Sequence, residues 1–188
     1  MHLQLSSVNY QLLVNNNKRL MMNFFRKNIK WILLGFFVLL NIFIILESTI
    51  SGEISGEQSS QFSNLAAEFI NTLKPETINF ENVEQFHGFI RKFFGHFLLF
   101  FGDGLLGFFT FHLLLKEKPL YVGFSIASAC GLFIAVSSEL IQLLIPERAG
   151  LLTDVLIDLL GYMIPLLLGY LIILIIDHRK NKSSQISE

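Results

Sequence analysis

Six polar side chains lie within or beside long apolar segments of the chain, and their types are those found in binding and catalytic sites. Imidazole and carboxylate groups can exchange protons with a substrate, and a guanidinium can hold a phosphate or carboxylate through two hydrogen bonds. An ionisable side chain inside a membrane costs about 2.5–3.5 kcal/mol on insertion scales, so it generally marks a functional position. The candidate residues are His96, Glu139, Gln142, Arg148, Asp154 and Asp158.

The spacing of these residues predicts that they converge. Gln142 follows Glu139 by three positions, and Asp158 follows Asp154 by four, so each pair shares one face of a helix. Arg148 lies in the short connection between the two pairs. We interpret the group as a functional cluster. A compatible structural interpretation is an ion-pair network in which Arg148 joins Glu139 or Asp154 and fixes the helix ends.

Two polar residues of an earlier apolar segment share one helix face. His96 lies near the start of that segment, and Asp103 follows it by seven positions, two helical turns deeper. His96 is therefore at the level of the predicted cluster. For Asp103 a proton relay is one interpretation, but we favour a hydrogen bond to a neighbouring helix, because a buried acid needs a partner.

The sequence lacks the short motifs that mark common catalytic and metal sites. It contains no Gly-rich phosphate loop, no CxxC pair, no HExxH helix and no GxSxG turn. Its single cysteine, Cys130, has no charged neighbour that would activate it as a nucleophile. We therefore expect neither a metal ion nor a cofactor.

The elements that must position these residues are four apolar segments. Of all residues 52% are hydrophobic and only 15% are charged, and the mean hydropathy is +0.55. This composition excludes a disordered chain and leaves too few charges to cover a water-soluble domain. A bilayer core of about 30 Å requires about 20 residues of helix. We predict an all-α integral membrane protein, a four-helix transmembrane bundle, with spans at residues 31–46 (extendable to 50), 93–115, 120–145 and 155–176.

Lysine and arginine positions predict the orientation of the spans, because these residues are enriched in cytoplasmic segments. The two tails, residues 1–30 and 177–188, and the connection between the second and third spans together contain ten of the 14 basic residues. The opposite side contains the other four. Both termini are therefore predicted to be cytoplasmic, which places the candidate cluster and a long loop, residues 47–92 approximately, outside.

The outer loop is acidic and is predicted to contain short interfacial helices. A tandem repeat at residues 50–57 is typical of a turn. The apolar periodicity then predicts a helix that begins near Ser63 or Asn64 and ends at Lys74. A second apolar stripe covers residues 80–90 and leads into the second span. These helices would lie in the membrane interface or cover the outer ends of the bundle.

Three sequence elements resemble those of VanZ-like membrane proteins. Residues 56–63 are similar to the family's Ser-rich GEQSS element, and residues 92–100 are similar to its K-x-x-x-H-F-x-x-F/Y opening of the second span. Residues 138–161 are similar to its S-x-E-x-x-Q…P-x-R…D-x-x-x-N-x-x-G signature, with Asp158 in place of the asparagine. The resemblance covers residues 31–176 and implies one four-span membrane domain.

The resemblance implies a multi-pass protein of the bacterial cell membrane. The family's name-giving member lowers susceptibility to teicoplanin, a glycopeptide antibiotic that carries a fatty acyl chain. We therefore favour a role in glycopeptide resistance or cell-envelope homeostasis, in which the outer cluster binds a lipoglycopeptide or a lipid-linked wall precursor without catalysis. The net charge of −1 gives the chain no general attraction for nucleic acid, and a homo-oligomer is compatible with this role.

Two other functions fit the same residues. In the first, His96 and Glu139 are the acid and base of a membrane enzyme that acts on a lipid-linked cell-wall precursor. In the second, Asp103, Glu139 and Asp158 form the proton path of a small transporter. No spacing in the sequence identifies a reaction class, so binding without catalysis is the leading hypothesis.

Overall fold

Helices are the only regular elements in the part of the chain that the structure describes. The computed structural model describes the backbone of residues 2–186 and the side chains of residues 18–180 and 182. In chain order the helices are α1 (His2–Ser48), α2 (Gly52–Leu73), α3 (Val83–Ile90), the π-helical segment η1 (Arg91–Leu98), α4 (Leu99–Leu114), α5 (Leu120–Gln142) and α6 (Leu152–Ile186). The all-α prediction is confirmed.

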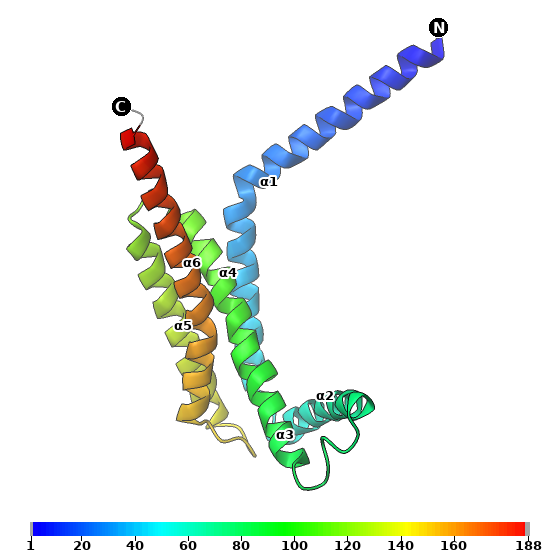
Figure 1. Cartoon of the computed structure of the whole chain (residues 1–188), viewed down its shortest axis with the longest axis vertical. Coiled ribbons are helices and arrows are strands. Elements are labelled where there is room, and N and C mark those ends of the chain that lie inside the picture. Colours follow the sequence, from blue (N-terminus) through cyan, green and yellow to red (C-terminus); the bar gives the residue numbers. More distant parts are fainter. Residues whose placement is uncertain (1, 187–188) are drawn as a thin grey trace.

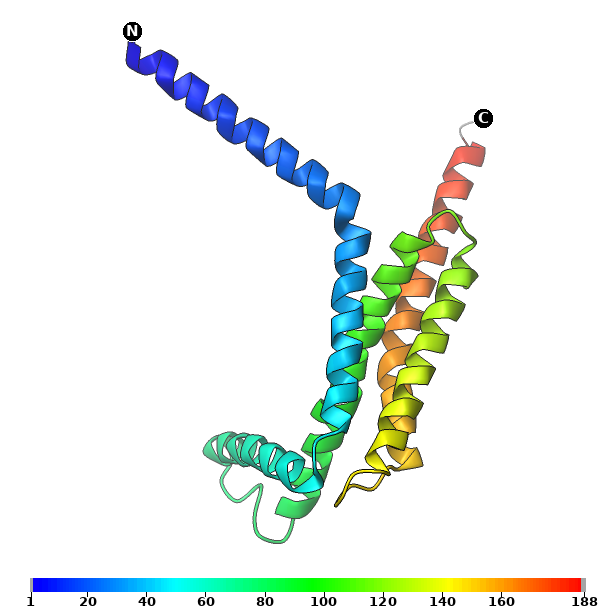
Figure 2. The same cartoon turned by 180° about the vertical axis from the view of Figure 1, so that it is seen from behind.

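Four helical stretches are long and apolar enough to cross a membrane, as predicted. Within the described side chains they are Lys18–Ser48, Val83–Leu114, Leu120–Gln142 and Leu152–Lys180. The helices α3, η1 and α4 follow one another without a break and together form the second stretch. Figures 1 and 2 show the four stretches packed side by side as a bundle, with α2 projecting sideways from the end that carries α3.

The helix α1 begins, and α6 ends, on the side of the bundle opposite α2 and α3 (Figure 1). An even number of crossings returns the chain to its starting side, so this arrangement agrees with four spans. Both helices extend beyond the predicted spans, because α1 starts at His2 and α6 continues to Ile186. Figure 2 shows that the N-terminal part of α1 bends away from the bundle. The cytoplasmic location of this side stays a prediction from the lysine and arginine distribution.

The first half of the outer loop differs from the prediction. Residues 52–57 of the repeat are helical and not a turn, because α2 begins at Gly52 rather than near Ser63. The physical reason is a helix cap: the Ser51 hydroxyl accepts a hydrogen bond from the backbone N–H of Ile54 at 3.5 Å. The predicted end of this helix and the second outer helix are both confirmed.

Tyr162 of α6 lies in the core of the bundle and is fully buried. Its hydroxyl donates a hydrogen bond to the Ala127 carbonyl of α5 at 2.9 Å, so the polar atom of this ring is satisfied. The backbone of α4 approaches the same residue at Gly104, where a Cβ would overlap the Tyr162 carbonyl. Close packing of α4 on α6 therefore requires glycine at position 104.

We expect Gly104→Ala to destabilise the bundle by about 1–3 kcal/mol, because the added methyl group meets backbone that cannot rotate away. Gly102→Ala is the matched control on the same helix, since a Cβ at Gly102 meets no atom within 4 Å. Unfolding in detergent can be followed by the reaction of Cys130, the only cysteine, with a thiol-reactive dye. Equal melting temperatures for the two variants would contradict the close approach of α4 and α6.

Candidate functional site

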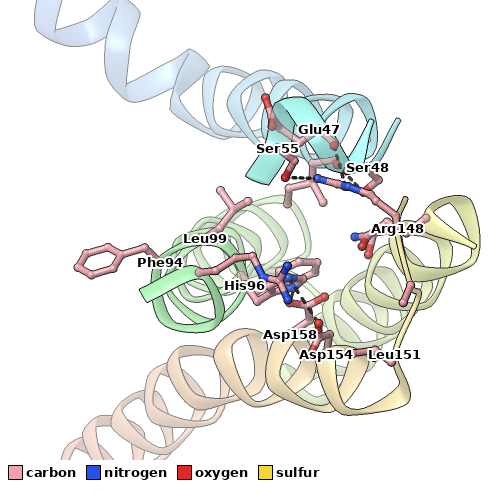
Figure 3. Close-up of a pocket in the computed structure, with 18 of the residues that line it drawn as sticks. Glu47, Ser48, Ser55, Phe94, His96, Leu99, Arg148, Leu151, Asp154 and Asp158 are labelled. Atoms are coloured by element: carbon pink, nitrogen blue, oxygen red, sulfur yellow. Dashed lines mark hydrogen bonds and ion pairs between the residues drawn. The ribbon is translucent and has the colours of Figure 1, made fainter. Parts of the chain in front are cut away.

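Four of the six candidate side chains converge near the end of the bundle that carries α2 and α3, and Figure 3 shows three of them labelled beside a pocket. We call His96 of η1, Glu139 of α5, and Asp154 and Asp158 of α6 the His96 cluster. The His96 Nδ1 atom lies 3.1 Å from Asp158 Oδ1 and 3.9 Å from Glu139 Oε1. The Nε2 atom of the same ring lies 3.8 Å from Asp154 Oδ2. All three carboxyl groups are buried, so the ring faces three acids away from bulk water.

The π-helical segment η1 presents His96 to α6. A π-helix is formed by i→i+5 hydrogen bonds, is rare, and frequently occurs at functional sites. The segment packs closely on α6 at Gly161, where a Cβ would overlap the Phe97 carbonyl. Lys92, four positions before His96, forms an ion pair with Asp154 Oδ1 at 2.8 Å. Two side chains of η1 therefore lie against the same carboxyl group of α6.

Glu139 connects the end of α5 to the start of α6. Its Oε2 atom accepts a hydrogen bond from the Leu151 backbone N–H at 2.9 Å, and its Oε1 atom accepts one from Gln142 Nε2 at 3.1 Å. The predicted shared face of Glu139 and Gln142 is thus confirmed. Gln142 itself positions Glu139 rather than joining the His96 cluster.

Asp158 is the most deeply buried acid of the His96 cluster, with a relative exposure of 0%. One of its carboxylate oxygens faces His96, whereas Oδ2 has no hydrogen-bond partner among the described residues. A buried polar atom without a partner is uncommon and energetically costly. Asp103 Oδ2 in α4 is unpartnered as well, but Asp158 also lines the cavity beside Asp154, so a ligand or ion there would be favourable.

Arg148 does not form the predicted ion-pair network. Its guanidinium donates one hydrogen bond to the Glu47 carbonyl at 3.1 Å and another to the Ser55 hydroxyl. The expected pairing with Glu139 or Asp154 is wrong, because the α5–α6 connection reaches toward α1 and α2 instead (Figure 3). Burial lowers the pKa of the Arg148 guanidinium, which nevertheless stays charged at neutral pH.

A cavity of about 500 Å³ lies beside the His96 cluster. Part of its wall consists of His96, Asp154 and Asp158. Two arginines, Arg91 and Arg148, and two glutamates, Glu47 and Glu147, line it as well. The apolar part of the wall includes Phe43, Ile44, Leu99 and Phe100. Cavities of about 300–1,000 Å³ that combine apolar surface with a few polar groups are typical of small-molecule sites.

The His96 cluster also contains a group that could hold a metal ion. One ligand atom from each of His96, Glu139 and Asp158 lies within 4.8 Å of the other two. The sequence does not predict this group, because its members come from η1, α5 and α6. The metal motifs sought in the sequence place several ligands on one short segment.

Sequence reasoning missed the contributions of Lys92, Arg91 and Ser55. The four-residue spacing of Lys92 and His96 could have indicated that both reach one neighbouring helix. Arg91 and Ser55 carry no comparable signal, because their roles depend on how α2 and η1 are placed against the α5–α6 connection.

Asp103 lies outside the His96 cluster and is fully buried in α4. Its Oδ1 atom accepts a hydrogen bond from Asn41 Nδ2 of α1 at 2.9 Å. The favoured interpretation, a hydrogen bond to a neighbouring helix, is therefore confirmed. The proton-relay hypothesis stays a prediction.

Comparison with known proteins supports the resemblance described above. The sequence model of the VanZ/LLP1 family matches residues 31–176, which include every residue of the His96 cluster and both cavity arginines. No curated protein and no solved structure gave a significant match.

Loss of Lys92 should destabilise the protein, because it leaves the Asp154 carboxylate buried without its cation. We expect Lys92→Met to lower the free energy of unfolding by about 1–3 kcal/mol, and Asp154→Asn in the same chain to restore part of that loss. Thermal unfolding of the single and double variants, followed by the reaction of Cys130 with a thiol-reactive dye, gives the coupling energy between Lys92 and Asp154.

The ion pair of Lys116 with Glu117 is the control for this cycle. Its side chains are 66% and 83% exposed, so the coupling there should be close to zero. Coupling of equal size in the two pairs would show that burial adds nothing to the Lys92–Asp154 interaction.

Proposed function

Because the chain belongs to the VanZ/LLP1 family, we propose that it binds an amphiphile with an anionic head group at the outer face of the bacterial cell membrane. Binding there would contribute to glycopeptide (teicoplanin) resistance or to cell-envelope homeostasis. The observation that carries the proposal is the cavity of about 500 Å³ in which two arginines lie beside apolar side chains.

The two arginines account for the anionic head group. Arg91 and Arg148 line the same cavity, and a guanidinium can hold phosphate or carboxylate oxygens through paired N–H donors. Arg148 is oriented in advance by its hydrogen bonds to the Glu47 carbonyl and the Ser55 hydroxyl. Such preorganisation reduces the entropy that is lost on binding.

The apolar wall accounts for the lipid part of the ligand. Phe43 and Ile44 come from α1, and Leu99 and Phe100 come from α4, so two membrane helices border the cavity. A site of this volume accommodates a head group and the adjoining part of a lipid chain rather than a complete glycopeptide. We therefore expect the remainder of a bound amphiphile to stay in the bilayer or above it.

The predicted orientation places this site on the side where the ligand is found. Ten of the 14 basic residues lie on the side of the termini, which predicts that the α2 and α3 side is outside. Glycopeptides and the wall precursors that they bind are exposed on that side of the membrane. A ligand outside the cell would therefore reach the cavity directly, which supports an envelope function.

A membrane enzyme is the second candidate, and the orientation of His96 favours it. The Asp158 Oδ1 atom lies 3.1 Å from His96 Nδ1, an arrangement that fixes the ring of a general base. Glu139 lies 3.9 Å from the same nitrogen and would be the acid or base partner. The substrate would be a lipid-linked cell-wall precursor whose charged head group contacts the arginines.

Expression of the chain in a sensitive host should raise the inhibitory concentration of teicoplanin severalfold and leave that of vancomycin, which lacks the acyl chain, unchanged. Arg91→Gln should abolish most of the increase, because a hydrogen bond to a charged group contributes about 1.5–3 kcal/mol. The measurement is a paired susceptibility test at equal amounts of membrane protein.

The matched control is Arg179→Gln, since Arg179 is an exposed arginine toward the other end of α6. A host that expresses Arg179→Gln should have the same inhibitory concentration of teicoplanin as a host that expresses the unmodified chain. If the two arginine variants behave alike, the cavity does not provide the head-group site.

Binding without turnover is the expected result when the purified chain is incubated with a polyprenyl-linked wall precursor. The lipid should co-purify with the protein and be recovered chemically unchanged, as shown by mass spectrometry. Product formation that disappears in His96→Gln, at an unchanged melting temperature, would replace the binding proposal with the enzyme.

A further inference from the structure

We propose that the His96 cluster is a binding site for a divalent transition-metal cation. His96, Glu139 and Asp158 would be the ligands, and Asp154 would orient the imidazole. The site goes beyond the amphiphile binding proposed above and does not depend on it, because neither cavity arginine belongs to the ligand set.

The distances between the side chains fit one shared metal ion. Bonds from a metal such as Zn²⁺ to imidazole nitrogen and carboxylate oxygen are about 2.0–2.2 Å long, which separates adjacent ligand atoms by about 3–4 Å. His96 Nδ1 lies 3.1 Å from Asp158 Oδ1 and 3.9 Å from Glu139 Oε1. One ligand atom from each of the three residues lies within 4.8 Å of the others. Small side-chain movements would therefore suffice to close the site around a cation.

The partners around these ligands are those of a metal site. A metal-binding histidine almost always offers its second ring nitrogen to a carboxylate, a carbonyl or water. While Nδ1 of His96 faces the other two ligands, Nε2 lies 3.8 Å from Asp154 Oδ2. Asp154 is held in turn by Lys92 at 2.8 Å. Glu139 is fixed by the Leu151 backbone N–H at 2.9 Å.

The unpartnered oxygen of Asp158 is an independent observation in favour of a cation. Asp158 is 0% exposed and its Oδ2 atom has no hydrogen-bond partner within the described residues. Three buried carboxyl groups meet here, and among the described side chains only Lys92 and His96 form ion pairs with them. A buried charge needs a compensating partner, and a divalent cation would supply both the charge and the missing contact.

The ligand types indicate which cations would bind. Imidazole nitrogen suits Zn²⁺ and other transition metals, whereas carboxylate oxygen suits Mn²⁺, Mg²⁺ and Ca²⁺. A mixed set of one nitrogen and several oxygens therefore favours Mn²⁺ or Zn²⁺ over Ca²⁺. The ion has an entry path, because His96 and Asp158 form part of the cavity wall.

Metal binding can be measured on the purified full-length chain in detergent, after treatment with a chelator and dialysis. In isothermal titration we expect one Mn²⁺ or Zn²⁺ to bind per chain, and Ca²⁺ to bind at least about tenfold more weakly. Pulsed electron paramagnetic resonance of the Mn²⁺-loaded chain should detect coupling to a nitrogen nucleus, because His96 supplies the nitrogen ligand.

Asp158→Asn is the most informative variant, because it removes one ligand charge while keeping nearly the same shape. Because the asparagine amide has nearly the same size as the carboxyl group, the variant should fold. We expect it to weaken Mn²⁺ binding at least about 10-fold, because changes to residues that only support metal ligands already cost about 10- to 100-fold. Asp103→Asn is the matched control, since it removes another fully buried carboxyl group, one that bonds to Asn41 and not to the His96 cluster. Its Mn²⁺ affinity should be unchanged.

Two results would overturn the proposal. One is a folded, unmodified chain that shows no saturable binding of Mn²⁺ or Zn²⁺. The other is an equal loss of affinity in Asp158→Asn and Asp103→Asn. If Asp158→Asn does not fold, the nitrogen coupling of the unmodified chain decides instead: it must be present, and it must disappear in His96→Gln.

Discussion

The close approach of α6 to α4 and η1 is the contact on which the rest of the structure depends. At two levels the backbones meet with no room for a Cβ: Gly104 of α4 faces the Tyr162 carbonyl, and Gly161 of α6 faces the Phe97 carbonyl of η1. In a bilayer, apolar side chains gain little by leaving lipid, so helices associate through such small-residue contacts. The second contact lies one residue from His96 and one helical turn from Asp158. Close backbone packing thus sets the distance at which histidine and carboxylate meet.

The arrangement of charge around the cavity follows from where each basic side chain finds its partner. Lys92 pairs with Asp154, so one ammonium group compensates part of the charge of the acids. Arg148 bonds instead to an uncharged carbonyl and a hydroxyl, those of Glu47 and Ser55. Had Arg148 paired with Glu139, its positive charge would have been compensated by the protein. Its hydrogen bonds go to neutral groups, so the guanidinium stays charged beside the cavity, where Glu47 and Glu147 form part of the same wall.

Much of the fold could be predicted because it follows from the composition of single segments. The four membrane stretches result from apolar runs, and the Glu139–Gln142 contact results from helical periodicity. The Asp103 hydrogen bond follows from the cost of burying an acid alone. What could not be predicted depends on contacts between segments. The start of α2 depends on one serine cap, and Arg148 donates a hydrogen bond to Ser55 in the first turn of that helix. The π-helical geometry of η1 has no periodicity signal of its own.

The aspartate at position 158 changes what the His96 cluster needs. An asparagine there would offer N–H donors and would add no charge. An ionised Asp158 has no hydrogen-bond donor in its side chain and adds a negative charge. Its Oδ2 atom has no partner among the described residues. Asp158 therefore requires a cation or a proton as its partner. It follows that the demand for positive charge is greater with aspartate at this position than it would be with asparagine. A positive partner at this point would compensate the charge of Asp154 and Asp158, which line the same cavity as Arg91 and Arg148.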